Sequence, residues 1–144
     1  MPAGPDPQEI TQRLSFDGRV VQLHGDWHPV NTLLRGDTFV VLDPIGFVGP
    51  AEYDVAAWCV RGRGEPDGLL ARLQAAVDAY PELDPEQLTL WTALDCLGRA
   101  RSARGASPAH WTRAASRLLH ATADGFSRHG GRSQQSMAQE ARER

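Results

Sequence analysis

Three oxygen-bearing side chains have types and spacing that suit phosphoryl transfer. Asp26 and Asn31 lie five residues apart in the segment "LHGDWHPVN", and Asp43 follows the apolar run "FVVL". Transfer of a phosphoryl group from a nucleotide needs a carboxylate that orients the attacking hydroxyl group and accepts its proton. It also needs hard oxygen ligands that hold magnesium against the phosphates. An aspartate, an asparagine and a second aspartate, in this order, provide both.

The same stretch resembles a known family. "HGDWHPVN" resembles the HxDxxxxN catalytic loop of the aminoglycoside phosphotransferases, which have a protein-kinase-like fold, and "VLDPIGFVGPAEYDVAAW" resembles the metal-binding segment after it. The chain is most similar to the branch of aminoglycoside or hydroxyurea antibiotic-resistance kinases, which includes streptomycin 6-phosphotransferases. The matching pattern comprises Asp43, Pro44, Gly46, Gly49, Tyr53 and Asp54. Its specific part spans residues 20 to about 60.

The resemblance implies a role for each candidate residue. Asp26 is expected to be the catalytic carboxylate, and Asn31 and Asp43 are expected to bind Mg²⁺ and, with it, ATP or GTP. His24 is expected to brace the loop. Asp54 is expected to accept hydrogen bonds from the loop backbone, because a carboxylate on a buried helix must be paired. The implied substrate is a small molecule with a hydroxyl group, such as a cationic aminoglycoside, in antibiotic resistance or secondary metabolism.

The hydrophobic pattern predicts the elements that position these residues. Residues 1–18 form a short lead and a helix, and residues 19–50 form β hairpins that carry the catalytic and metal loops. Residues 51–130 change to a helical period and predict a bundle. The tail, residues 131–144, has almost nothing to bury and is predicted to be disordered. The expected fold is mainly α with a small antiparallel β element, as in the carboxy-terminal, catalytic lobe of a protein-kinase-like fold.

Local signals mark the ends of several elements. Asp6-Pro7, Asp84-Pro85 and Ser107-Pro108 each combine a capping side chain with a proline in the first helical turn, and so predict three helix starts. The segment "NTLLRGDTFVVLD" predicts two strands around a turn at residues 35–37. "RVVQL" before the catalytic loop predicts another strand of the same small antiparallel region.

The family fold also has an amino-terminal lobe, which covers the nucleotide and carries a lysine that pairs with its phosphates. The 22 residues before the catalytic loop are too few for that lobe, and all 15 basic residues are arginines. Arginine does not replace lysine at such a site. The sequence therefore predicts the catalytic lobe alone, weakly active or inactive by itself.

"HGDWHPVN" could be only a polar hairpin turn capped by Asp and Asn side chains. Two other functions also stay open. The chain could be a degenerate kinase lobe without catalysis. The less favoured alternative is that Gly25-Asp26-x-His28 belongs to a metal-dependent phosphoesterase site, which would need further His and Asn ligands. His28 is otherwise expected to pack in the loop, as are Trp27 and Trp58.

Composition narrows the class of partner. A net charge of −3 and a pI near 5.9 argue against nucleic acid and membrane surfaces, which select basic proteins. The sequence contains no apolar run long enough for a membrane span and no signal-peptide pattern, so a cytoplasmic location is expected. Cys59 and Cys96 are expected to be buried, reduced thiols. The oligomeric state is not predicted.

Several acidic residues could face a cationic substrate. These are Glu52, Glu65, Asp67 and Asp95. A solvated helix face is the expected environment of each.

Overall fold

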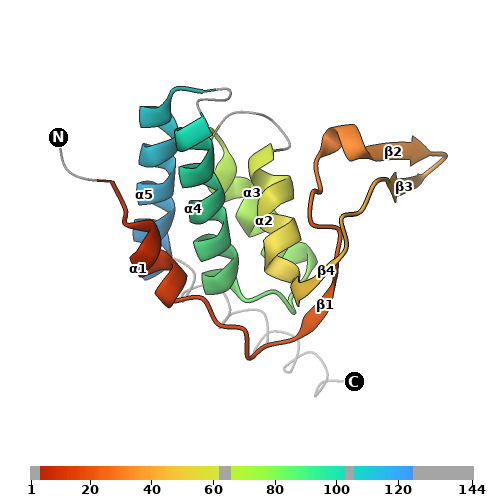
Figure 1. Ribbon diagram of the computed structural model, residues 1–144, viewed down its shortest axis with the longest axis horizontal. Coiled ribbons are helices and arrows are strands. Elements are labelled where there is room, and N and C mark those ends of the chain that lie inside the picture. The colour runs from red at the N-terminus through yellow and green to blue at the C-terminus, as the bar shows by residue number, and fades with distance from the viewer. Residues whose placement is uncertain (1–3, 62–65, 103–105, 125–144) are drawn as a thin grey trace, which may run out of the picture.

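The computed structural model describes residues 4–61, 66–102 and 106–124, so the predicted tail lies outside the described residues. In chain order the elements are α1 (Pro7–Gln12), β1 (Val20–Leu23), the 3₁₀ turn η1 (Pro29–Asn31), β2 (Thr32–Arg35), β3 (Thr38–Val41), β4 (Phe47–Pro50), α2 (Ala51–Arg61), α3 (Leu69–Ala79), α4 (Pro85–Ser102) and α5 (Pro108–Asp124). This confirms the mainly α fold class with a small antiparallel β element. The helices lie side by side, and the β2–β3 hairpin projects away from them (Figure 1).

The three predicted helix starts are capped by the expected side chains. Asp6 Oδ1 accepts a hydrogen bond from the amide of Gln8 at 2.8 Å at the start of α1. Asp84 Oδ1 accepts from two amides of the first turn of α4, at 2.8 and 3.1 Å. Ser107 Oγ accepts from an amide of the first turn of α5 at 3.3 Å. These bonds satisfy amides that have no partner within the helix.

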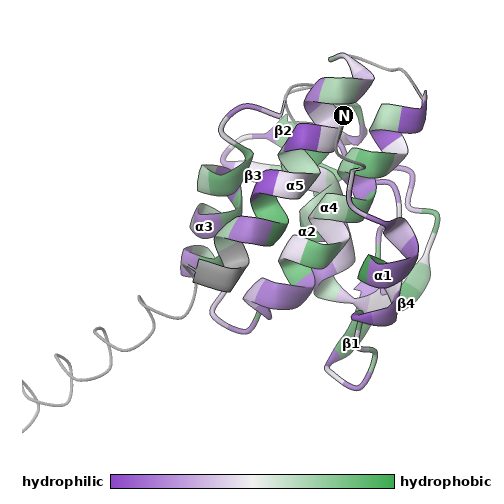
Figure 2. Cartoon of the chain, turned by 90° about the vertical axis from the view of Figure 1, so that its left-hand side faces the viewer, coloured by the Kyte–Doolittle hydropathy of each residue, from purple (hydrophilic) through white to green (hydrophobic). Residues whose placement is uncertain are grey.

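The core lies among the helices. α4 packs between α2 and α5, and α1 lies against it. α3, α4 and α5 each carry both hydrophilic and hydrophobic residues, and their buried hydrophobic residues form the core (Figure 2). The largest fully buried side chains are Trp111, Leu73, Leu88, Leu90, Val60, Thr89, Thr92 and Cys96. None of the helices in the described ranges is long and apolar enough to cross a lipid bilayer.

Both cysteines are free and buried in this core, as the sequence predicts. Burial raises the pKa of the Cys59 thiol from 9.0 to about 11. It raises the pKa of the Cys96 thiol to about 12, with a further contribution from the neighbouring Asp95 carboxylate. Both side chains are therefore protonated at neutral pH.

The strands form two separate antiparallel pairs. β2 and β3 form the predicted hairpin, in a register that runs from Thr32↔Val41 to Arg35↔Thr38. β1 does not join that hairpin; it pairs with β4, from Val20↔Pro50 to Leu23↔Phe47. The sequence pattern did not predict β4. The β1–β4 pair holds the two ends of the segment that contains both candidate loops, and β4 leads directly into α2.

The projecting hairpin is apolar on both faces. Leu33 and Leu34 are neighbours on β2 and point to opposite faces, yet 53% and 67% of their surfaces are exposed. Phe39 on β3 is 70% exposed. An isolated two-stranded hairpin is marginally stable in water, so few contacts besides its own ladder hold this part of the chain.

Candidate functional site

The catalytic-loop candidate is anchored to α2 through Asp54. Asp54 is 8% exposed, and its Oδ2 accepts a hydrogen bond from the amide of His24 at 2.6 Å. Its Oδ1 accepts from the amide of Gly25 at 3.0 Å. Gly25 has φ 84°, and a Cβ there would lie 2.7 Å from the ring of Phe47, so the turn needs glycine. The structure thus places Asp54 in the contact expected of it.

The ring of His24 joins the two candidate loops. Its Nδ1 accepts a hydrogen bond from the amide of Asp26 at 3.2 Å, and its Nε2 donates to the carbonyl of Leu42 at 2.6 Å. The tautomer with its proton on Nε2 satisfies both bonds. The backbone carbonyl of His24 accepts from Ile45 at 2.8 Å. His24 therefore braces the loop against the segment that carries Asp43.

Asn31 makes a second connection between the same segments. Its Nδ2 donates to the carbonyl of Asp26 at 3.1 Å, and its own carbonyl accepts from the amide of Leu42 at 2.8 Å. Within the described residues no hydrogen bond reaches Asn31 Oδ1, so this oxygen is available as a ligand. The bond from Nδ2 sets which way the side-chain amide points.

Asp43 follows Leu42 and has an exposed side chain. Its φ of 55° lies in the left-handed region. All the other described residues with a positive φ are glycines. Its carboxylate makes no hydrogen bond or ion pair with any other described residue. Because Leu42 is bonded through its carbonyl to His24 and through its amide to Asn31, the backbones of all three candidate site residues meet at one place.

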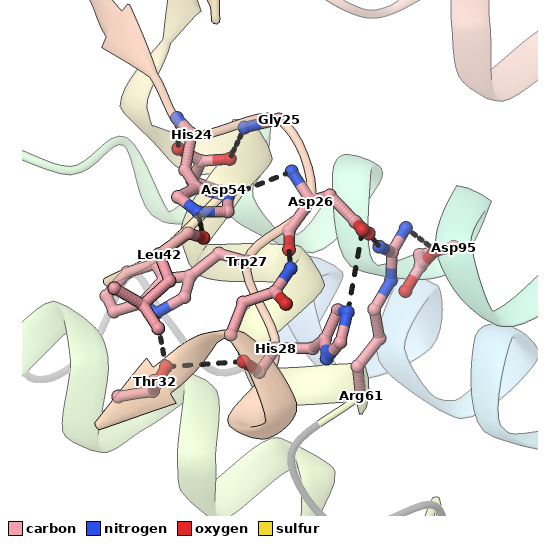
Figure 3. A network of polar contacts seen from close by, with 11 residues as sticks. His24, Gly25, Asp26, Trp27, His28, Thr32, Leu42, Asp54, Arg61 and Asp95 are labelled. Atoms are coloured by element: carbon pink, nitrogen blue, oxygen red, sulfur yellow. Dashed lines mark hydrogen bonds and ion pairs between the residues drawn. The ribbon is translucent and has the colours of Figure 1, made fainter. Parts of the chain in front are cut away.

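The carboxylate of Asp26 has an arginine partner that the sequence did not reveal. Arg61 Nη1, at the end of α2, lies 2.7 Å from Asp26 Oδ1, and its Nη2 lies 3.4 Å from Asp95 Oδ1 on α4. His28 Nε2 lies 3.5 Å from Asp26 Oδ2. In Figure 3 His28 from the loop and Arg61 from α2 reach the carboxylate of Asp26, and Asp95 from α4 contacts Arg61 on its other side.

Trp27 and Trp58 pack as expected and stiffen the loop. Their rings stack with centroids 4.9 Å apart and an interplanar angle of 30°. Trp27 Nε1 donates to Thr32 Oγ1 at 3.3 Å, and this hydroxyl donates to the carbonyl of His28 at 3.2 Å (Figure 3). The chain on the carboxy-terminal side of Asp26 is thereby held to α2.

The expectation of a solvated helix face is wrong for two of the four acidic residues. Glu52 is 8% exposed, and its Oε1 accepts from the amide of Asp84 at 2.8 Å. The side chain of Asp95 is 22% exposed because it pairs with Arg61. Asp67 has 74% of its side chain exposed, as expected, and Glu65 lies outside the described residues.

A metal ion would find few protein ligands here. The described part of the chain contains no group of three or more His, Cys, Asp or Glu side chains that could hold one. Asn31 Oδ1 and the Asp43 carboxylate are the oxygens without partners beside the loop. Such a small set fits Mg²⁺, which keeps several waters and binds through one or two carboxylates together with substrate phosphates.

No protein-family model, curated protein or solved structure matches the chain. The function therefore has to be inferred from the residues and their geometry.

Proposed function

We propose that the chain is the catalytic lobe of a small-molecule kinase of the aminoglycoside phosphotransferase type, which transfers the terminal phosphoryl group of ATP or GTP to an alcohol. The observation that carries this proposal is the bridging ring of His24, bonded to the amide of Asp26 and the carbonyl of Leu42. It connects the loop with the candidate base to the strand end before Asp43. A polar turn that only joined two strands would not need this connection.

Asp26 is the group that acts on the acceptor. Its Oδ1 is held by Arg61 at 2.7 Å, and its Oδ2, which faces His28 Nε2 at 3.5 Å, is the oxygen that would accept a hydrogen bond from the attacking hydroxyl group. Asp54 and His24 fix the backbone on its amino-terminal side, and Asn31 holds its carbonyl. A positioned carboxylate that accepts the proton accelerates such reactions by about a hundred to ten thousand fold.

Asn31 and Asp43 would hold the metal and the nucleotide. The two residues offer one amide oxygen and one carboxylate without partners in the described ranges, a set that suits a hard cation. Bound Mg²⁺ would neutralise charge on the nucleotide phosphates. The phosphoesterase alternative needs a larger cluster of His and Asp ligands, and the described residues do not supply one.

The acceptor class rests on the resemblance alone, which points to a hydroxyl group of an aminoglycoside such as streptomycin. The chain contains no lysine to pair with the nucleotide phosphates. We therefore propose that it is weakly active or inactive alone. A degenerate lobe would keep the fold but would bind no nucleotide.

Nucleotide binding can be tested without turnover. Titration of the ¹⁵N-labelled protein with ADP in the presence of Mg²⁺ is expected to shift the amide signals of His24, Asn31 and Asp43. Asp43→Asn should abolish these shifts, whereas Asp78→Asn, on the exposed side of α3, should leave them unchanged. Absence of any shift in the wild-type protein would contradict the kinase proposal and favour the degenerate lobe.

Turnover is the second test. Transfer of labelled phosphate from ATP to streptomycin is expected to be slow but above background, and Asp26→Asn should reduce it at least about a hundredfold. A wild-type rate above background that Asp26→Asn leaves unchanged would exclude Asp26 as the base.

A further inference from the structure

A large cavity lies beside the candidate site but is not part of it. It has a volume of about 770 Å³ and lies between the chain around β1 and the helices α2 and α3. Asp26, Asn31 and Asp43 do not line it. Cavities of roughly 300–1,000 Å³ are typical of small-molecule sites in proteins. The size of this one therefore suits a ligand rather than a few water molecules.

Aromatic side chains form much of the cavity wall. Phe16, Trp27, Trp58 and Tyr80 all line it. Trp27 and Trp58 are the stacked pair next to the catalytic loop. Phe16 and Tyr80 are 62% and 56% exposed, respectively, so part of each ring is accessible to a ligand. The faces of such rings attract cations through their electron density.

A buried carboxylate with a vacant oxygen also lines the cavity. Glu52 is 8% exposed, and only its Oε1 is used, by the amide of Asp84 at 2.8 Å. None of the arginines or histidines in the described ranges forms an ion pair with it. Its Oε2 is reached by solvent at the cavity wall, where the positive charge of a ligand can pair with it.

The other charged residues that line the cavity also favour a positively charged ligand. Glu82 and Asp84 add two exposed carboxylates, against two arginines. Arg72 is already held, because its Nε and Nη1 each donate to a backbone carbonyl at 2.9 Å. Arg19 is exposed. The lining therefore has more carboxylates than guanidinium groups, and its buried charge is negative.

We propose that this cavity binds an organic cation with an apolar body. The cationic group pairs with the free oxygen of Glu52, and the body packs against Trp27 and Trp58. This site does not depend on the proposed kinase activity, because it requires neither a nucleotide nor the carboxylate of Asp26. Occupancy would be felt at the catalytic loop through Trp27, which directly follows Asp26.

A pair of probes of equal shape tests the proposal on the full chain. Benzyltrimethylammonium carries the charge, and neopentylbenzene is its neutral isostere. We expect calorimetry to show that the cation binds at least about tenfold more tightly than the isostere. The indole N–H signals of Trp27 and Trp58 should shift on binding, whereas that of Trp111, which is fully buried in the core, should not. Equal affinities, or no binding of the cation, would overturn the proposal.

Variants locate the site. Glu52→Gln keeps an acceptor for the amide of Asp84 but removes the charge, and should weaken cation binding about tenfold, or about 1.4 kcal/mol. Ala75→Trp on α3 fills the cavity and should abolish binding. Its matched control is Ala71→Trp, one turn earlier on the same helix, which is exposed and outside the lining. Unchanged binding in Ala75→Trp would show that the probe binds elsewhere, and would overturn the assignment even if Glu52→Gln did not fold.

Discussion

Replacing Asp54 with asparagine should destabilise the protein by breaking the anchor of the candidate loop around Asp26. The two oxygens of Asp54 accept from the amides of His24 and Gly25, at 2.6 and 3.0 Å. Asparagine offers a single acceptor oxygen, and its nitrogen can only donate, so one of these amides loses its partner. A hydrogen bond to a charged group contributes about 1.5–3 kcal/mol. The remaining bond loses its charge and with it about 1 kcal/mol. The expected loss is about 2.5–4 kcal/mol of the free energy of unfolding.

Urea unfolding followed by tryptophan fluorescence measures this loss, with the slope m as the check that the unfolded state is unchanged. The matched control is Asp78→Asn on α3, whose carboxylate is exposed and accepts only from Gln74 Nε2 at 2.8 Å. It should change stability by less than about 0.5 kcal/mol. Hydrogen exchange should also accelerate at the amides of His24 and Gly25. If Asp54→Asn matches the control in stability and leaves both amides protected, the anchoring argument is refuted.

Three further predictions concern stability. Burial raises the pKa of Cys59 from 9.0 to about 11 and that of Cys96 to about 12, so the unfolded chain loses these protons first, and stability should fall as the pH rises from about 9 to 12. In urea unfolding at several pH values, stability should fall less steeply with pH in a variant that has both thiols replaced by alanine. If this variant shows the same fall as the wild-type protein, the thiols are not the cause of the fall. Gly25→Ala should cost about 2–5 kcal/mol through its positive φ and a clash with an aromatic ring, whereas Gly36→Ala, with open space around it, should cost only about 1–2 kcal/mol. Equal shifts of the urea midpoint would contradict the clash. Asp84→Ala removes the cap of α4 and should cost about 1 kcal/mol by the same measurement, and no loss would show that the two amides find other acceptors.

Local signals were enough to predict most of the fold. The starts of α1, α4 and α5 were predictable because a capping side chain and a proline lie within a few residues of each other. The β2–β3 hairpin was predictable because its turn is built by adjacent residues, with Gly36 in a left-handed conformation. In each case the interactions that define the element are between neighbours in the sequence.

Contacts between distant residues were not predictable. β4 contains only four residues, Phe47–Pro50, and its partner β1 is separated from it by the whole hairpin. Arg61 reaches Asp26 only because α2 has the length that brings its last turn beside the loop. Asp95 joins them through the packing of α2 against α4. No spacing rule links these positions, so a single sequence contains no signal for them.

The candidate site was partly predictable. The sequence named Asp26, Asn31 and Asp43 from their chemistry and resemblance, and the structure brings their backbones together through His24. The sequence could not predict which residue each of these side chains contacts. The burial of Glu52 depends on how the start of α2 meets the chain before α4, which is a property of the tertiary structure.

The left-handed backbone at Asp43 offers a way to separate selection for folding from selection for the proposed metal binding. Glycine adopts φ 55° without steric cost, whereas a residue with a Cβ does not. In a library randomised at this position, survivors chosen for heat resistance alone should therefore become rich in glycine. Survivors chosen for the binding of Mg²⁺ and ADP, which we propose for this residue, should instead keep aspartate. The ratio of the two residues among survivors would report whether Asp43 serves that binding at the expense of folding.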